Sequence, residues 1–314
     1  MPSQVTLVYG PTASGKSALA VDLACAQGGV VINADAMQLY REMRILTARP
    51  STADEAAAPH RLYGTVAMTD AWNVARWRDA ALQEIEQARA AGKAPILVGG
   101  TGLYLDALLR GLSPVPAIDP DIRAQAIALH AQLGGEAFRA ALAKRDPETA
   151  ARLAPGDTHR LIRAWEVVEG TGQKMGAFRD APRQGPPPGM NFTLVALLPP
   201  REQSYASVEQ RFDRMIADGV LDEVARIRDL QLDPALPAMK AHGLRALLGY
   251  LDGATTLEDA VAYAKKETRW YVKRQTTWFR HQVPAWPLTA QKQLEQQYSD
   301  SAREEVVRFV RSSG

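Results

Sequence analysis

Cysteine is almost absent from the chain, which has one, Cys25, in 314 residues. A single cysteine excludes an internal disulfide, and its place in an apolar helical stretch predicts a buried thiol with no chemical role. No apolar run is long enough to cross a bilayer, and the β-type run that begins at residue 5 leaves no room for a signal peptide. We therefore expect a cytoplasmic protein that has no membrane partner.

The chain also lacks an excess of either charge. Its 37 Lys and Arg residues against 35 Asp and Glu residues give a net charge of +2, with a charged content of 23%. That balance excludes a general affinity for polyanions, so any contact with nucleic acid has to come from local basic clusters. The length favours two unequal domains over one.

Short apolar strands alternate with helices in the first hundred residues. Strands are expected at residues 5–9, 30–32 and 94–98, with helices from Lys16 onward and over residues 74–91. Buried strands that alternate with helices are typical of a parallel α/β sheet.

A block of helices interrupts this pattern. Beyond residue 116 only helices are expected until a Pro-rich linker at residues 182–189, after which residues 192–198 form another buried strand. We therefore predict an α/β fold with a P-loop NTPase-like parallel sheet core, residues 1–116 and 191–314, and an inserted all-helical domain, residues 117–190. From about residue 205 the sequence predicts helices alone.

The segment after the first expected strand carries the P-loop signature, Gly-x4-Gly-Lys-Ser, between a strand and a helix. Its glycines let backbone N–H groups turn inward around phosphate oxygens, and the following helix N-terminus adds partial positive charge. Lys16 would neutralise the phosphates, and the Ser17 hydroxyl would ligate Mg²⁺. Nucleotides and prenyl diphosphates present the same group, so the signature leaves the ligand open. The expected diphosphate site comprises Gly10, Pro11, Thr12, Ala13, Ser14, Gly15, Lys16 and Ser17.

Two further features bear on the ligand. An ordinary P-loop NTPase ends a later strand with an Asp that holds the Mg²⁺ shell, whereas here that strand runs into Gly99, Gly100 and Thr101. An acid, Asp35, instead follows the second strand. Because the carboxyl ends of parallel strands converge on one crevice, Asp35, Thr101 and the signature loop should face one another. A helix N-cap is an equally good interpretation of Asp35 from its position alone.

Segments spread over nearly the whole chain resemble the tRNA dimethylallyltransferase family, also called tRNA isopentenyltransferases. They are Gly-Pro-Thr-Ala-Ser-Gly-Lys-Ser at 10–17, Asp-Ala-Met-Gln-Leu-Tyr at 35–40, Ala-Pro-His-Arg-Leu at 58–62, Val-Gly-Gly-Thr-Gly-Leu-Tyr at 98–104, Arg-Leu-Ile-Arg-Ala-Trp-Glu-Val at 160–167, Arg-Phe-Asp-Arg-Met at 211–215 and Lys-Arg-Gln-Thr-Thr-Trp-Phe-Arg at 273–280. The chain departs from the family at Ala36, usually Ser, and in residues 46–50 and 241–245. These departures concern local tRNA contacts.

The resemblance implies a reaction and a role for each site residue. The family moves a dimethylallyl group from dimethylallyl diphosphate to the exocyclic amine, N6, of the adenosine beside the anticodon of tRNA. Lys16, with Mg²⁺ on Ser17, would stabilise the departing diphosphate. Thr101 would bond the bridging oxygen, and Arg211 would add a phosphate cation. Asp35 would accept the amine proton. The family also suggests a monomer.

The target base has to leave its stack to react, so the tRNA anticodon loop is the expected partner. Gln38 could bond the edge of the extracted base, and basic residues among aromatic ones in residues 265–280 suit single-stranded RNA. A solvated charged face is the alternative interpretation of the cluster around Arg160. By resemblance the tRNA-contacting residues are Asp35, Ala36, Met37, Gln38, Thr101, Arg123, His159, Arg160, Leu161, Ile162, Arg163, Lys240, Arg245, Lys273 and Arg274.

Two other classes of protein carry the same signature loop. A small-molecule or nucleoside kinase would also use a carboxylate to activate its acceptor, and an RNA-binding ATPase would need no acceptor at all. Both would bind ATP, and the missing strand-end Asp argues against both. Whether the loop also binds ATP stays open at this stage.

Overall fold

A computed structural model describes residues 3–313 of the chain, which divide into two compact units. One unit contains Met1–Arg110 and Pro186–Gly314, and the other contains Gly111–Gly185. The second unit is therefore inserted into the first, and it begins and ends a few residues before the expected limits of 117 and 190.

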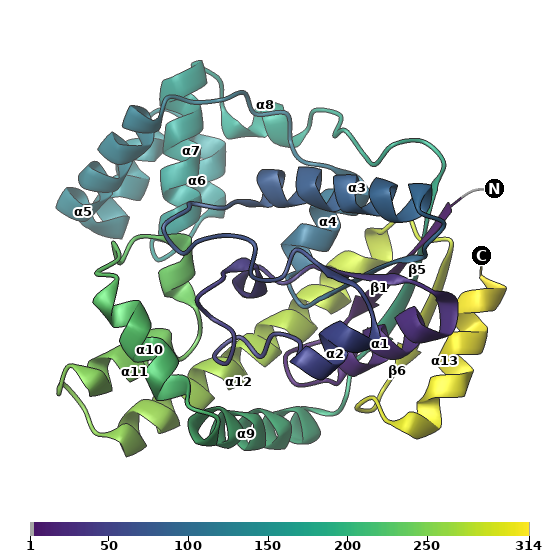
Figure 1. The fold of residues 1–314 in the computed structure, drawn as a ribbon. Coiled ribbons are helices and arrows are strands. Elements are labelled where there is room, and N and C mark those ends of the chain that lie inside the picture. The colour runs from purple at the N-terminus through teal and green to yellow at the C-terminus, as the bar shows by residue number, and fades with distance from the viewer. Residues whose placement is uncertain (1–2, 314) are drawn as a thin grey trace. The chain divides into compact units, whose positions relative to one another are not determined.

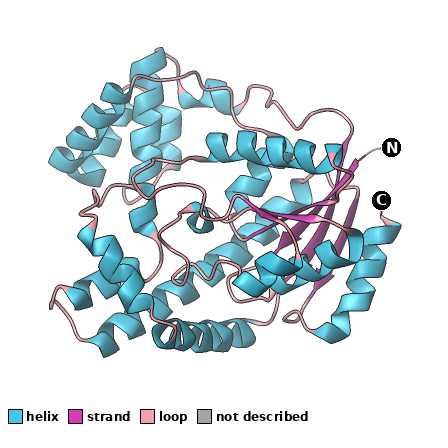
Figure 2. Cartoon of the chain, viewed as in Figure 1, coloured by secondary structure: helices cyan, strands magenta, loops and turns pink. Residues whose placement is uncertain are grey.

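The first unit is built on a single parallel sheet of six strands in the order β3-β2-β4-β1-β5-β6. Its central strand pairs Thr6 with Ile96 on one side and with Thr193 on the other. Figure 2 shows these strands with helices around them. The strands are β1 Ser3–Tyr9, β2 Val30–Asn33, β3 His60–Arg61, β4 Pro95–Gly99, β5 Met190–Leu197 and β6 Ala290–Leu294.

Helices cover both faces of this sheet because side chains of a strand alternate between faces. Leu7 of β1 packs in a core with Trp77 and Phe279, whereas Val8 packs in another with Leu19 and Val306. Figure 1 shows two helices of the second core, α1 and α13, side by side. The helices of this unit are α1 Lys16–Gln27, α2 Thr52–Ala57, α3 Val74–Ala90, α4 Gly102–Arg110, α9 Arg201–Ala217, α10 Val220–Asp229, α11 Leu244–Leu251, α12 Leu257–Gln282 and α13 Asp300–Ser312, with short 3₁₀ helices η1 Met37–Leu39, η2 Pro237–Lys240 and η3 Val283–Ala285.

The only regular elements in the inserted unit, all of whose residues the structure describes, are helices. Its core packs Phe138 against Trp165, and the guanidinium of Arg145 lies 4.4 Å from the Trp165 ring. The first helix of this unit kinks at Gly134, where φ is 72°. The helices are α5 Pro120–Ala143, α6 Pro147–Arg152, α7 Thr158–Thr171 and α8 Met175–Arg179.

The fold class is confirmed, and three local expectations need correction. The expectation of helices alone after residue 205 is wrong, because β6 adds an edge strand whose polar sequence lacks the apolar run of a buried strand. The two-residue strand β3 was too short to detect. Cys25 is exposed rather than buried, and its thiol donates to the Ala57 carbonyl at 3.5 Å. None of the helices within residues 3–313 has the length and apolarity that a membrane crossing requires.

Candidate active site

The loop formed by residues 10–17 connects β1 to α1 and presents unused backbone donors. Ala13 and Gly15 both adopt positive φ, 63° and 85°, which turns successive peptides in different directions. The amides of Ala13, Gly15, Lys16 and Ser17 have no acceptor among the described residues. Such a cluster of donors at a helix N-terminus is suited to bind an anion.

Gln275 of α12 holds the first half of this loop. Its side-chain oxygen accepts from the Thr12 amide at 2.9 Å, and its side-chain nitrogen donates to the Gly100 carbonyl at 2.9 Å. Tyr9 donates to the Gln275 carbonyl at 2.8 Å. The buried side-chain amide of Gln275 therefore connects the ends of β1 and β4 to the long helix α12.

Asp35 follows β2 and faces the same region. Its backbone N–H donates to Asn33 Oδ1 at 2.8 Å, and Asn33 Nδ2 donates back to the Asp35 carbonyl at 2.9 Å. The Asp35 carboxylate accepts from the amide of Met37, the first residue of η1, at 3.0 Å, although the N-cap position itself is Ala36. This bond uses one lone pair of one oxygen, and the side chain still lines a cavity. The two interpretations of Asp35 are therefore compatible.

Thr101 lies between β4 and α4, next to Asp35 and Tyr271. Its hydroxyl oxygen accepts from the Ala36 amide at 3.0 Å, which leaves the hydroxyl proton to be donated elsewhere. Burial, and after it the charge of Asp35, raises the pKa of the Tyr271 phenol above its usual range, against the hydrogen bonds of Thr101 and Gln275. Tyr271 therefore stays protonated at any physiological pH.

These residues enclose a cavity of about 200 Å³ in the α/β unit. One part of its wall is polar, with Thr12, Asp35, Thr101 and Arg211. The Arg211 guanidinium donates to Thr12 Oγ1 at 2.5 Å, which ties α9 to the 10–17 loop. The remaining lining is mainly apolar and includes Ala36, Met37, Leu46, Val208, Phe212, Met215 and Ala241. Such a cavity suits a ligand with one anionic end and one hydrocarbon end.

The two cations of the site are desolvated. Burial lowers the pKa of Lys16 to about 8, with Asp35 opposing the shift and Arg211 adding to it. Burial likewise lowers the pKa of Arg211 to about 10, again opposed by Asp35. Lys16 Nζ donates to the Pro11 carbonyl at 3.3 Å. A bound anion would replace lost hydration around both groups and raise the pKa of both.

A loop of residues 41–50 forms one side of the cavity through Leu46 and Thr47. The carboxylate of Glu223, buried on α10, accepts the amides of Arg44, Ile45 and Leu46 at 2.8, 2.8 and 2.9 Å. No sequence signal indicated this role. Three backbone donors on one carboxylate fix the loop firmly.

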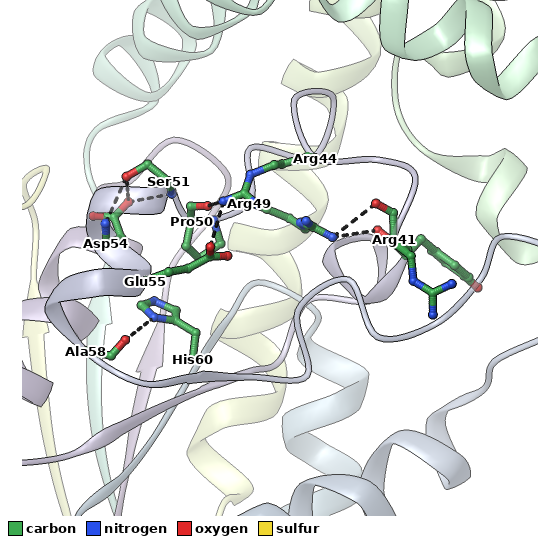
Figure 3. A network of polar contacts seen from close by, with 10 residues as sticks. Arg41, Arg44, Arg49, Pro50, Ser51, Asp54, Glu55, Ala58 and His60 are labelled. Atoms are coloured by element: carbon green, nitrogen blue, oxygen red, sulfur yellow. Dashed lines mark hydrogen bonds and ion pairs between the residues drawn. The ribbon is translucent and has the colours of Figure 1, made fainter.

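Two arginines of the same loop, Arg44 and Arg49, also stabilise it, as Figure 3 shows. Arg44 donates to the Pro50 carbonyl at 2.9 Å and pairs with Glu55 at 3.0 Å. Arg49 donates to the carbonyls of Tyr40 and Arg41, both at 3.4 Å, and burial lowers its pKa. Residues 46–50, where the chain departs from the family pattern, therefore take part in a network of hydrogen bonds within the protein.

The side-chain nitrogen of Gln38 is already bonded within the protein. Both hydrogen bonds of its side-chain nitrogen go to the 41–50 loop, to the carbonyls of Thr47 at 2.9 Å and Ala48 at 3.0 Å. The expectation that Gln38 bonds the edge of a base therefore has to be restricted to its side-chain oxygen.

The basic cluster of the inserted unit surrounds a buried acid. Arg123 and Arg163 both pair with Glu166, at 3.0 and 3.4 Å. Arg160 is exposed, and no ion pair is recorded for it within residues 3–313; His159 is also exposed. Leu161 and Ile162 are buried in this unit's core, so we correct the expectation that their side chains touch RNA.

The basic residues of α12 fall into three groups. Lys265 and Arg269 pair with Asp213 and Glu209 of α9, at 2.5 and 2.6 Å. Arg274 lies over the Tyr271 ring and Lys266 over the exposed Trp270 ring. Lys273 and Arg280 line a second cavity, of about 840 Å³, in the same unit. Among the described residues of α12, no ion pair with a carboxylate is recorded for Lys266, Lys273, Arg274 or Arg280.

Residues 240–245, which run from η2 to α11, lie beside the cavity of about 200 Å³. Lys240 and His242 line the cavity, whereas Arg245 is exposed. His242 lies 3.4 Å from Glu267, and its ring centroid is 4.6 Å from that of Tyr271. Sequence reasoning counted Tyr271 only among the aromatic residues that could stack on RNA bases, and it assigned no role to Gln275. The spacing of four residues puts both on one face of α12.

A metal ion would find few protein ligands here. No group of three or more His, Cys, Asp or Glu side chains within residues 3–313 is placed to hold one. Mg²⁺ typically keeps several waters and binds through substrate phosphates with one or two protein oxygens. The Ser17 hydroxyl at the start of α1 fits such a minimal donor set.

The parallel sheet, the glycine-containing loop at residues 10–17 and the cavity beside Asp35 and Thr101 define an α/β protein with a P-loop-like core. The model of the family described as IPP transferase matches residues 38–282. The chain belongs to this family.

Similar proteins extend the match to nearly the whole chain. A tRNA dimethylallyltransferase of Rhodospirillum centenum is 54% identical over 281 residues, which cover 90% of both chains. One of Paramagnetospirillum magneticum is 51% identical over 290 residues, 92% of this chain and 91% of that one. The crystal structure of a tRNA isopentenylpyrophosphate transferase from Bacillus halodurans is 29% identical and covers 100% of this chain and 97% of that chain, with a TM-score of 0.70.

Proposed function

We propose that the protein transfers a dimethylallyl group from dimethylallyl diphosphate to N6 of the adenosine adjacent to the anticodon in tRNA. The observation that carries the proposal is the cavity in which Asp35 and Thr101 lie beside Thr12 and Arg211, with an apolar wall opposite. Family membership and relatives above 50% identity support the same reaction.

The diphosphate would bind to the 10–17 loop. Its oxygens would accept from the free amides of the loop, with Lys16 and Arg211 supplying charge. The hydrocarbon part would lie against Val208 and Phe212 of α9. A Mg²⁺ ion held by Ser17 and the substrate would further neutralise the diphosphate.

The reaction breaks the bond between carbon 1 of the dimethylallyl group and the diphosphate oxygen. Negative charge builds up on that oxygen, so the hydroxyl of Thr101 and the loop amides would stabilise the transition state more than the bound substrate. The bond between carbon 1 and adenine N6 forms, and the N6 proton passes to the Asp35 carboxylate. Products are prenylated tRNA and diphosphate.

Release of diphosphate tests this function against its alternatives. With the protein and dimethylallyl diphosphate, we expect diphosphate release only when tRNA is present, and no hydrolysis of ATP with or without tRNA. Turnover of ATP without prenyl transfer would instead indicate a kinase or an RNA-dependent ATPase.

A further inference from the structure

A short segment between β6 and α13 contacts the outer side of the 10–17 loop. The backbone N–H of Tyr298 donates to the Ser14 carbonyl at 3.1 Å, and Gln297 Nε2 donates to the Ala13 carbonyl at 3.1 Å. Both contacts join residues that are more than 280 positions apart in sequence. Residues 297 and 298 thus stabilise the 10–17 loop, which lies near the N-terminal end of the sequence.

These bonds set the direction of the donor that faces the ligand. In a trans peptide the carbonyl and the following N–H point in opposite directions. Because Tyr298 holds the Ser14 carbonyl, the Gly15 N–H points away from the C-terminal segment, and it has no acceptor among the described residues. Gln297 likewise holds the carbonyl of Ala13, a non-glycine residue with a positive φ of 63°, which persists only where neighbours stabilise it.

The segment is itself firmly anchored. The Tyr298 hydroxyl donates to Asp22 of α1 at 2.5 Å, and Gln297 Nε2 also contacts Ser207 of α9. Tyr298 packs directly on Gly15, where a Cβ atom would lie 2.9 Å from the Tyr298 Cβ. The loop is therefore held between two helices and the C-terminal segment before any ligand arrives.

We propose that Gln297 and Tyr298 are positioning residues of the diphosphate site, which keep the 10–17 loop in its ligand-binding conformation. This inference rests on the proposed binding of a diphosphate by the loop. Without these contacts the loop samples other conformations, and apparent affinity falls in proportion to the competent fraction. Saturating ligand draws the loop back into place, so the effect falls on KM and spares kcat.

Gln297→Met keeps the length of the side chain and removes its donor. We expect the Kd and KM for dimethylallyl diphosphate to rise about fivefold, because the bond to the Ala13 carbonyl is lost together with the contact to Ser207. The kcat and the tRNA affinity should stay within about twofold of wild type. Hydrogen exchange of the loop amides should be faster than in the wild type without ligand and should return to the wild-type rate with inorganic diphosphate. Tyr298→Phe, which removes the bond from the hydroxyl to Asp22 and keeps the backbone bond to Ser14, should show the same pattern at about twofold.

Gln296→Met is the matched control, because Gln296 is the exposed neighbour of Gln297. It should bind dimethylallyl diphosphate as the wild type does. If wild type binds the diphosphate and both Gln297→Met and Tyr298→Phe bind it equally well with unchanged loop exchange, the inference is wrong. A wild type that fails to bind the diphosphate would contradict the proposed function instead. A variant with a lower Tm but wild-type Kd and exchange would show a role in stability alone.

Discussion

Positive charge is used differently in the two units of the molecule. In the α/β unit, Lys16 and Arg211 are partly buried, and burial lowers the pKa of both. In the inserted unit, Arg123 and Arg163 are about half exposed and share the carboxylate of Glu166, while Arg160 is exposed. Desolvated cations gain most from a bound anion, whereas solvated ones contribute weakly and depend on salt. Under the proposed function, the first set would stabilise the diphosphate and the second would attract RNA.

The largest effect is expected from Asp35→Asn. The amide keeps the size of the side chain and can still accept from the Met37 amide, but it cannot take a proton. We expect kcat to fall by about 10² to 10⁴, with affinities for tRNA and dimethylallyl diphosphate little changed. Rapid-quench single-turnover rates measure this, and a mutant rate within about fivefold of wild type would reduce Asp35 to a cap of η1.

Lys16→Ala should have the next largest effect. Removing a desolvated cation from the diphosphate site should lower kcat/KM for dimethylallyl diphosphate by roughly 10². The affinity for tRNA should stay within about twofold of wild type, because the charge acts on the other substrate. Steady-state kinetics with each substrate varied in turn measure both quantities. An equal loss of tRNA affinity would contradict the separation of diphosphate binding from RNA attraction.

The lowered pKa of Lys16 predicts a pH dependence in the alkaline range. With a pKa of about 8 in the free protein, Lys16 is charged below pH 8 and increasingly neutral above it. Binding a diphosphate above pH 8 requires uptake of a proton, so the Kd should rise by up to about tenfold per pH unit between pH 8 and 10.

Lys16→Met is the control for this dependence. It should bind weakly and show no such rise over the same pH range. The stability of the protein without ligand should change in the opposite sense. The unfolded chain holds the Lys16 proton up to about pH 10.5, whereas the folded protein releases it from about pH 8. The contribution of Lys16 to the free energy of unfolding therefore increases from pH 8 to 10.5. A wild-type Kd that is flat from pH 8 to 10 would show that Lys16 keeps its charge there.

The smallest effects are expected in the inserted unit. Arg160→Ala should weaken tRNA binding and reduce the slope of log Kd against log salt by about one, without a change in kcat. Arg123→Ala should change the slope less, because Arg123 already pairs with the carboxylate of Glu166. Filter binding at several salt concentrations measures both, and a wild-type slope for Arg160→Ala would leave this helix face as solvated surface.

The sequence predicted those parts of the site that lie on local motifs. The 10–17 loop, Asp35 after β2 and Thr101 after β4 each follow a buried strand, and a parallel sheet brings such positions together. Gln275, Glu223, Gln297 and Tyr298 were not predicted, because their roles depend on contacts with backbone groups far away in the chain. Strand β6 was missed for the related reason that an edge strand needs no apolar run.

Mass analysis of adenosine from treated tRNA tests the central claim most directly. After incubation of tRNA with the protein, Mg²⁺ and dimethylallyl diphosphate, we expect the adenosine beside the anticodon to gain the mass of one five-carbon prenyl group. The same adenosine should stay unmodified with Asp35→Asn over the time in which wild type completes the reaction. Unmodified adenosine with wild type, or an equal yield with the mutant, would contradict the account.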